Sequence, residues 1–211
     1  MIKYFTNREL SQRLGINLAR WKRWSREFLP PDPLGGLQSG YARQYNPNEA
    51  FTVHLGGYLV ATGKFSIPEA KQILSDLHEW LSGNGFYFDV NGSVDFSKGV
   101  ARLVKKTVVF IIKNSDVNDG TPIFQYVIRG VISKKSVRSE GYDVMQELYT
   151  ETLINADADP FLDLATNTAK TLEISSFLNR FVECVGLDAV HYSALNQKES
   201  INSKLQAPNY K

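Results

Sequence analysis

Apolar positions in the first thirty residues recur every three or four residues, which is typical of short amphipathic helices. The first predicted helix covers NRELSQRL, with Thr6 and Glu9 spaced as a capping box at its start. The second predicted helix covers LARWKRWSREF, where the Asn17 side chain can accept from the first amides. The spacing predicts that Trp21 and Trp24 face inward, which leaves the cations of this segment on the flanks and the outer face.

A proline-rich stop and a glycine-rich loop follow the second helix. Three prolines between residues 30 and 33 forbid its continuation, because each ring removes an amide donor and restricts the preceding residue. The stretch GGLQSGYARQY then supplies glycines for a reversal, and Tyr41, Arg43 and Tyr45 alternate along it. We expect a short two-stranded wing here, whose arginine and tyrosine side chains can reach phosphates beside a DNA groove.

The pattern changes from helical to strand-like spacing near residue 84. Before it, two further helices are predicted in NPNEAFTVHLGGYLVATGKF and SIPEAKQILSDLHEWLSGNG, the second with Ser66 as N-cap, Pro68 in its first turn and Gly83 near its end. Beyond it, FYFDVNGSVDF carries an Asn-Gly hairpin signal, and KTVVFIIKNS with TPIFQYVIRGVISKK predicts a second hairpin. The segment YDVMQELYTETLI fits a strand or a helix, and we expect an antiparallel sheet from about residue 86 to 154.

One more helix is predicted in TLEISSFLNRFVECVG, with an apolar stripe from Ile174 to Val185 and Gly186 closing it. The stripe is either core or a dimer seam. The polar stretch NQKESINSKLQAPNYK is expected to fray. Together the patterns predict an α+β fold. An all-α winged helix-turn-helix domain of residues 1–83 precedes an antiparallel β-rich domain of residues 84–195, which contains this helix, and a polar tail of residues 196–211.

Charge is segregated along the chain although the net charge is only +2. Residues 1–46 hold eight Lys or Arg against three Asp or Glu, whereas residues 140–188 hold ten acids against Lys170 and Arg180. The first segment therefore suits a polyanion and the second would repel one. No apolar run reaches the length that a bilayer requires, and the start MIKYFTNREL lacks the apolar core of a signal peptide. We expect a cytoplasmic protein without a membrane partner.

Metal, cofactor and catalytic chemistry find little support in the sequence. The single cysteine, Cys184, excludes an internal disulfide, and the three histidines are too far apart for zinc-ligand spacing. The loop that holds Asp157 and Asp159 lacks the glycine and distal glutamate of a calcium loop. No nucleophile with a base and no phosphate loop is visible, so we expect no cofactor and no enzyme activity.

Three segments together resemble the DNA-binding domain of the MerR family of bacterial transcription regulators: ELSQRLGINLARWKRW, GYARQY and GYLVATGKFSIPEAKQIL. The resemblance covers about residues 3–82. It implies a helix-turn-helix, a wing and two further helices, with Trp21 and Trp24 in the core. It also implies that DNA is contacted by the start and outer face of the second helix and by the wing, which correspond to Asn17, Arg20, Lys22, Arg23, Tyr41 and Arg43.

The chain also departs from the family. The segment PPDPLGGLQS is longer than usual, Ala42 separates the wing tyrosine from its arginine, and no long dimerisation helix follows. Excisionase-like or architectural DNA binding is therefore an alternative, as are a winged helix used only for protein contacts and an enzyme delivered to DNA. The leading expectation is a sequence-specific transcription regulator that binds double-stranded DNA as a homodimer. RNA polymerase and a small-molecule effector are further expected partners, and the C-terminal domain is expected to sense a ligand or mediate assembly.

Overall fold

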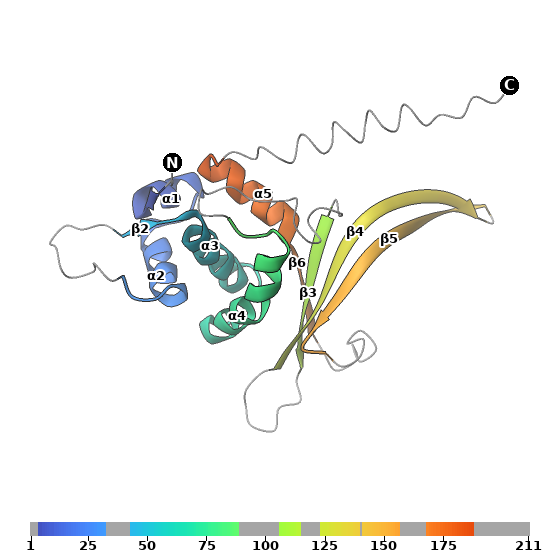
Figure 1. Cartoon of the computed structure of the whole chain (residues 1–211), viewed down its shortest axis with the longest axis horizontal. Coiled ribbons are helices and arrows are strands. Elements are labelled where there is room, and N and C mark those ends of the chain that lie inside the picture. Colours follow the sequence, from blue (N-terminus) through green and yellow to red (C-terminus); the bar gives the residue numbers. More distant parts are fainter. Residues whose placement is uncertain are drawn as a thin grey trace.

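The computed structural model describes residues 4–32, 43–88, 106–114, 123–139, 141–156 and 168–187. Over these residues the protein has a mixed α+β fold with five helices, a two-stranded sheet and a four-stranded antiparallel sheet (Figure 1). The expected α+β class is confirmed.

Local capping signals set the starts of the first two helices. Helix α1 (Asn7–Arg13) begins at Thr6, which forms the predicted capping box with Glu9. Helix α2 (Leu18–Phe28) begins at Asn17, whose Oδ1 accepts from two amides of its first turn. Gly15 lies between the helices with φ of 64°, a left-handed conformation that glycine adopts without strain. The two helices and their tight turn therefore lie where the sequence predicted them.

Helices α3 (Pro47–Ala61) and α4 (Ile67–Gly83) also start at capping boxes, formed by Asn46 with Glu49 and by Ser66 with Glu69. Helix α3 is apolar on all sides, which is typical of a buried helix, and it lies between α2 and α4 (Figure 1). Helix α2 packs against α3. Helices α2 and α4 therefore pack on α3 from two sides.

The predicted wing is only partly as expected. Strand β2 (Gln44–Tyr45) pairs with β1 (Phe5–Thr6) near the start of the chain, with Phe5 opposite Tyr45. The sequence placed residues 41–45 in a wing of its own and gave no sign of this partner. Pairing the loop with β1 buries Phe5 and Tyr45 in the core, which the wing prediction had not anticipated. Tyr41 lies outside the described residues.

The larger sheet has the strand order β5-β4-β3-β6, with every neighbouring pair antiparallel. Its strands are β3 (Lys106–Asn114), β4 (Ile123–Ser139), β5 (Tyr142–Ile154) and β6 (Thr168–Glu173). The β3–β4 pairing confirms the second predicted hairpin, and the ambiguous segment is strand β5. The predicted Asn-Gly hairpin at residues 91–92 lies outside the described residues.

Strand β6 corrects the expected start of the last helix. Residues 168–173 pair with β3, so α5 (Ile174–Val185) begins three residues later than predicted. The sheet also extends to residue 173 instead of ending near 154.

The helix-facing side of the sheet packs on α4, where Tyr126 Oη donates to Asp76 Oδ2 over 2.6 Å. Gly186 ends α5 in the left-handed conformation, as predicted.

Helix α5 packs on the N-terminal helices. The rings of Phe51 in α3 and Phe181 in α5 have centroids 5.4 Å apart, and Arg13 Nη1 donates to the carbonyl oxygen of Val185 over 2.8 Å. The stripe residues Ile174 and Val185 are fully buried within the chain. The stripe is therefore core, and the alternative that it forms a dimer seam is wrong. One apolar core also continues across the boundary predicted at residues 83–84.

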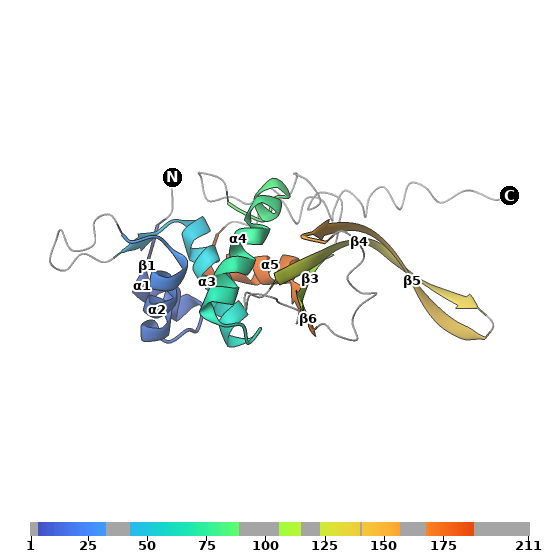
Figure 2. The ribbon, with the colours of Figure 1, turned by 90° about the horizontal axis from the view of Figure 1, so that it is seen from below.

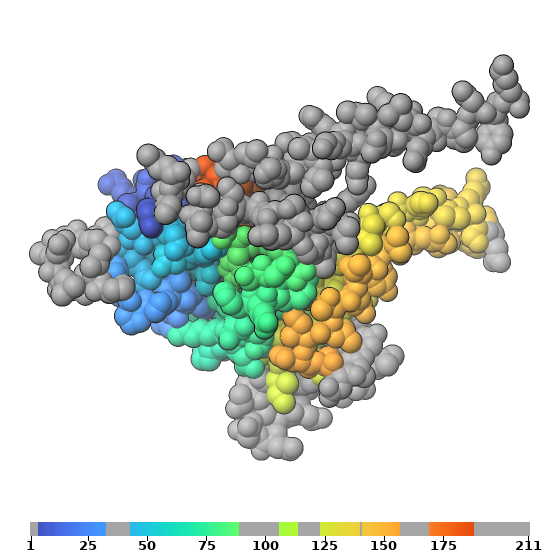
Figure 3. Space-filling view, in the orientation of Figure 1, coloured from blue at the N-terminus to red at the C-terminus, as the bar shows by residue number. Residues whose placement is uncertain are grey.

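Strands β4 and β5 continue past the described end of β3, where Lys106 lies opposite Val131. Residues 133–139 of β4 and 142–148 of β5 form a two-stranded ribbon that projects from the body (Figures 1 and 2). The space-filling view shows this ribbon, in yellow and orange, standing away from the helices (Figure 3). We call these two segments the β-arm.

Candidate nucleic-acid interface

Helix α2 has one buried and one exposed face. Trp21, Trp24 and Ser25 form the buried face, with 0%, 7% and 3% of their surface exposed. The helical period then places the remaining side chains outward. Both tryptophans are in the core, as the sequence predicted.

The exposed face of α2 is basic. Its four cations are all solvent-exposed, and we call them the α2 cations: Arg20, Lys22, Arg23 and Arg26. The only acid of the helix, Glu27, pairs instead with Lys71 of α4 over 3.0 Å. Within the part of the chain that the structure describes, no ion pair or hydrogen bond holds the side-chain charges of the α2 cations. This concentration of uncompensated positive charge favours an anionic partner.

Asn17 fixes the start of this face. Its Oδ1 accepts from Ala19 N over 3.0 Å and from Arg20 N over 3.3 Å. The exposed Asn17 side chain thus lies at the positive end of the helix dipole, where an anion is favoured. Its predicted position at the start of the second helix is correct, while its proposed DNA contact stays a prediction.

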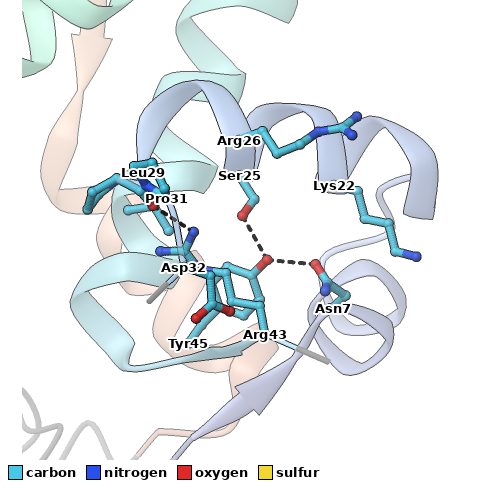
Figure 4. A pocket seen from close by; sticks show the side chains of 10 residues that line it. Asn7, Lys22, Ser25, Arg26, Leu29, Pro31, Asp32, Arg43 and Tyr45 are labelled. Atoms are coloured by element: carbon cyan, nitrogen blue, oxygen red, sulfur yellow. Dashed lines mark hydrogen bonds between the residues drawn. The ribbon is translucent and has the colours of Figure 1, made fainter. Parts of the chain in front are cut away.

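A buried polar network holds α2 to α1 and β2. The Tyr45 hydroxyl donates to Asn7 Oδ1 over 2.7 Å and lies 2.7 Å from Ser25 Oγ, which can donate to it (Figure 4). The Tyr45 ring also meets Trp21 edge-on, with centroids 5.8 Å apart. Burial raises the pKa of the Tyr45 hydroxyl, so it stays protonated and able to donate. These contacts orient the basic helix.

Arg43 has partners inside the chain. Its guanidinium donates to the carbonyl oxygen of Pro30 over 2.9 Å and pairs with Glu49 over 3.5 Å, with 15% of the side chain exposed. It also lies over the Tyr45 ring, 5.6 Å from the centroid. The sequence predicted that Arg43 contacts a phosphate. In the structure its guanidinium instead joins the end of α2, at Pro30, to the start of α3, at Glu49.

Two of the hollows beside α2 are lined by its cations. One, of about 460 Å³, lies between α2 and β2 and includes Lys22 and Arg26 in its lining. In Figure 4 both side chains extend away from the Tyr45 network. The other, of about 440 Å³, is lined in part by Arg20, Arg23 and Lys64.

Two basic residues that line these hollows were absent from the predicted interface. Arg26 follows Lys22 by four residues, so helical spacing alone could have placed both beside the same hollow. Lys64 lies in the turn after α3, with φ of 61°. Only the packing of α2 beside α3 brings Lys64 to the hollow that Arg20 and Arg23 also line. No sequence signal identifies Lys64.

No group of three or more His, Cys, Asp or Glu side chains able to hold a metal ion occurs among the described residues. None of the described helices combines the length and apolarity that crossing a bilayer requires. Comparisons with known protein families and with curated proteins find no match. The basic face of α2 is therefore the feature on which a functional proposal can rest.

Proposed function

We propose that this protein binds double-stranded DNA by placing the exposed face of α2 in the major groove. The observation that carries the proposal is the set of four exposed α2 cations without an acidic partner among the described residues, on a helix fixed by buried tryptophans. In this proposal α1 and α2 form a MerR-like helix-turn-helix. The protein acts as a transcription regulator, with RNA polymerase and a small-molecule effector as further partners.

The dimensions of α2 support this docking. Its 11 residues span about 16 Å, and the major groove is about 12 Å wide and admits a helix. Arg23 and Arg26 lie opposite the buried tryptophans, where base edges or the groove floor are within reach. Arg20 and Lys22 lie on the two flanks, where phosphates line the groove.

The charge distribution orients the protein on DNA. Helix α2 lies at one end of the molecule and the β-arm at the other (Figure 1). Residues 140–188, which include all of the edge strand β5, carry ten acids against two cations. Electrostatic steering would therefore favour approach of the duplex to the α2 end over approach to the β5 edge of the sheet.

The test is a salt titration of binding to labelled duplexes, both random and selected, followed by fluorescence anisotropy. Each phosphate contact contributes about 0.9 to the slope of log K against log salt. We expect Lys22→Ala to lower the slope by about that amount on both duplexes. Arg23→Ala should cost about 1 to 3 kcal/mol on the selected duplex if the side chain reads a base edge. Lys170→Ala removes an exposed cation from β6 and is the matched control, which should leave binding unchanged.

The Arg43→Ala variant distinguishes a structural role of Arg43 from a phosphate contact. Because its guanidinium bonds to Pro30 and Glu49, we expect a lower melting temperature and an unchanged salt slope. A reduced slope at unchanged stability would return Arg43 to the DNA contacts. If Lys22→Ala and Arg23→Ala bind both duplexes like the unmodified chain and like Lys170→Ala, α2 is not the DNA-binding element.

A further inference from the structure

The hollow between α2 and the turn after α3 combines positive charge with apolar walls. Its volume is about 440 Å³, and among the described residues that line it none is acidic. We call it the α2–α3 hollow. Its cations are Arg20, Arg23 and Lys64, and its apolar side chains are Trp24, Val60, Ala61 and Ile67. Apolar walls with a few polar groups, at about this volume, are typical of small-molecule sites.

The cations of the hollow come from two elements. Arg20 and Arg23 are three residues apart, so both side chains leave α2 on neighbouring positions of one side. Lys64 lies in the turn between α3 and α4, and its Nζ donates to the carbonyl oxygen of Ala61 over 2.7 Å. An ammonium group has three donors, so this bond leaves Lys64 able to bind an anion as well. Glu69, in the first turn of α4, pairs with Lys113 over 2.6 Å and is not part of the lining.

The apolar wall is formed by a buried ring and by the ends of two helices. Trp24 is only 7% exposed, so its indole is a fixed side of the hollow. Val60 and Ala61 are the last two residues of α3, and Ile67 is the first residue of α4. A bare inorganic anion would leave this wall in water. A ligand with an apolar body would cover the wall, which is favourable.

Two other hollows beside α2 suit an anion less well. The hollow between α2 and β2 includes Asp32 in its lining, beside the cations that it contains. The hollow near the end of α2 includes Glu27 and Lys71, which form an ion pair with each other over 3.0 Å. Charge therefore favours the α2–α3 hollow as the site for an anionic ligand.

We propose that the α2–α3 hollow binds a small organic anion that contains an aromatic ring. Its negative group lies among Arg20, Arg23 and Lys64, and its ring lies against the apolar wall. Guanidinium groups suit both parts of such a ligand, because they pair with anionic oxygens and stack on aromatic rings. The sequence placed ligand sensing in the C-terminal domain, whereas this site lies among the N-terminal helices.

Such a ligand would compete with DNA for α2. Arg20 and Arg23 both contact DNA in the proposed complex, so the ligand and the duplex cannot use them at the same time. A competing ligand at a free concentration of ten times its Kd lowers the apparent affinity for DNA about tenfold. This consequence rests on the proposed function, whereas the ligand site itself does not.

The site is tested without DNA, by equilibrium dialysis of the full chain against naphthalene-2-sulfonate, a bicyclic aromatic anion. We expect Lys64→Gln to weaken binding about fivefold, the upper end for an ion pair at an exposed position. Lys22→Gln is the matched control, because it also removes one exposed cation but lines the other hollow. It should bind the sulfonate like the unmodified chain, and thermal melts should show all three chains folded. An unmodified chain that does not bind the sulfonate, or equal binding by the two variants, overturns the proposal.

Two simpler ligands test the two parts of the proposed chemistry. Sulfate has the charge without the ring, and 2-naphthol has the ring without the charge. Neither should displace naphthalene-2-sulfonate when it is added at the same concentration. Displacement by sulfate would show a site for a bare anion, such as a DNA phosphate, and displacement by 2-naphthol would show a purely apolar site. Either result overturns the proposal.

Fluorescence anisotropy with a labelled duplex then tests the competition. At ten times its Kd, naphthalene-2-sulfonate should weaken DNA binding by the unmodified chain about tenfold, and sodium chloride of equal ionic strength should not. Unchanged DNA affinity in the presence of bound sulfonate overturns the competition. A chain that binds the sulfonate in dialysis but binds no DNA would contradict the proposed function alone, and the ligand site would stand.

Discussion

Replacing Gly57 by alanine should destabilise the protein, although alanine is the better helix former. Gly57 lies in the middle of α3, where α2 crosses it. A Cβ atom at this position would lie 2.2 Å from Cε3 and 2.4 Å from Cζ3 of Trp24. Carbon atoms in contact normally stay about 3.5 to 4.0 Å apart. The indole is buried and rigid, so it can avoid the new methyl group only if α2 moves.

The size of the effect follows from two opposing terms. Glycine to alanine inside a helix stabilises by about 1 kcal/mol when the methyl group has room. Overpacking of a core costs about 1 to 3 kcal/mol, and an overlap of more than 1 Å with a rigid ring belongs at the upper end. We therefore expect a net loss of about 2 kcal/mol. For a chain of this length, that loss lowers the melting temperature by about 4 to 8 °C.

Thermal and urea unfolding followed by circular dichroism measure this loss. Gly83→Ala is the matched control, because Gly83 is the last residue of α4 and a Cβ there would meet no atom within 4 Å. It should leave stability unchanged or raise it slightly. The double variant Gly57→Ala with Trp24→Leu should be destabilised by less than the sum of the single variants, since leucine relieves the overlap. A melting temperature of Gly57→Ala at or above that of the unmodified chain would refute this account of the α2–α3 contact.

Two other predictions concern the packing of α5 on the N-terminal helices. The imidazole of His54 stacks on the ring of Phe177 with centroids 4.8 Å apart, and burial lowers the pKa of His54 from 6.5 to about 4. Between these two pH values the unfolded chain binds more protons than the folded chain. The free energy of unfolding should therefore be fully present above pH 6.5 and should fall by roughly 3 kcal/mol as the pH falls toward 4. Urea titrations across this range should show a smaller loss for His54→Phe, which keeps the stack without the proton; equal losses would contradict the assignment. A fragment of residues 1–83 lacks α5, so Phe51 loses its contact with Phe181. We expect this fragment to unfold at a lower temperature than the full chain. Independent folding with undiminished stability would instead support the domain boundary predicted from the sequence.

The functional surface was only partly predictable from the sequence. The α2 cations could be read from helical spacing because the tryptophans mark the buried face within the same helix. The partners of Arg43 could not, because its contacts with Pro30 and Glu49 depend on how the chain returns after the proline stop. The hollow lined by Arg20, Arg23 and Lys64 also depends on tertiary packing, because α2 and α3 must approach each other closely to form it.

The sequence by itself determined the first four helices, since each starts from capping signals within one or two turns. Ser66 with Glu69 in α4 is an example, because the capping bonds join residues three apart. The β-branched runs likewise determined that β3 and β4 are strands. Such interactions are local and need no knowledge of the rest of the chain.

Only the tertiary structure decided what the elements pack against. Strand β2 pairs with β1, residues 168–173 join the sheet because β3 offers a free edge, and α5 turns its stripe inward onto α1 and α3. The bond from Arg13 to Val185 joins residues 172 positions apart. An apolar stripe indicates that one face of a helix must be buried. It does not identify the element that buries this face, because the hydrophobic effect is non-directional. The partner is settled only when distant segments compete for the same surface.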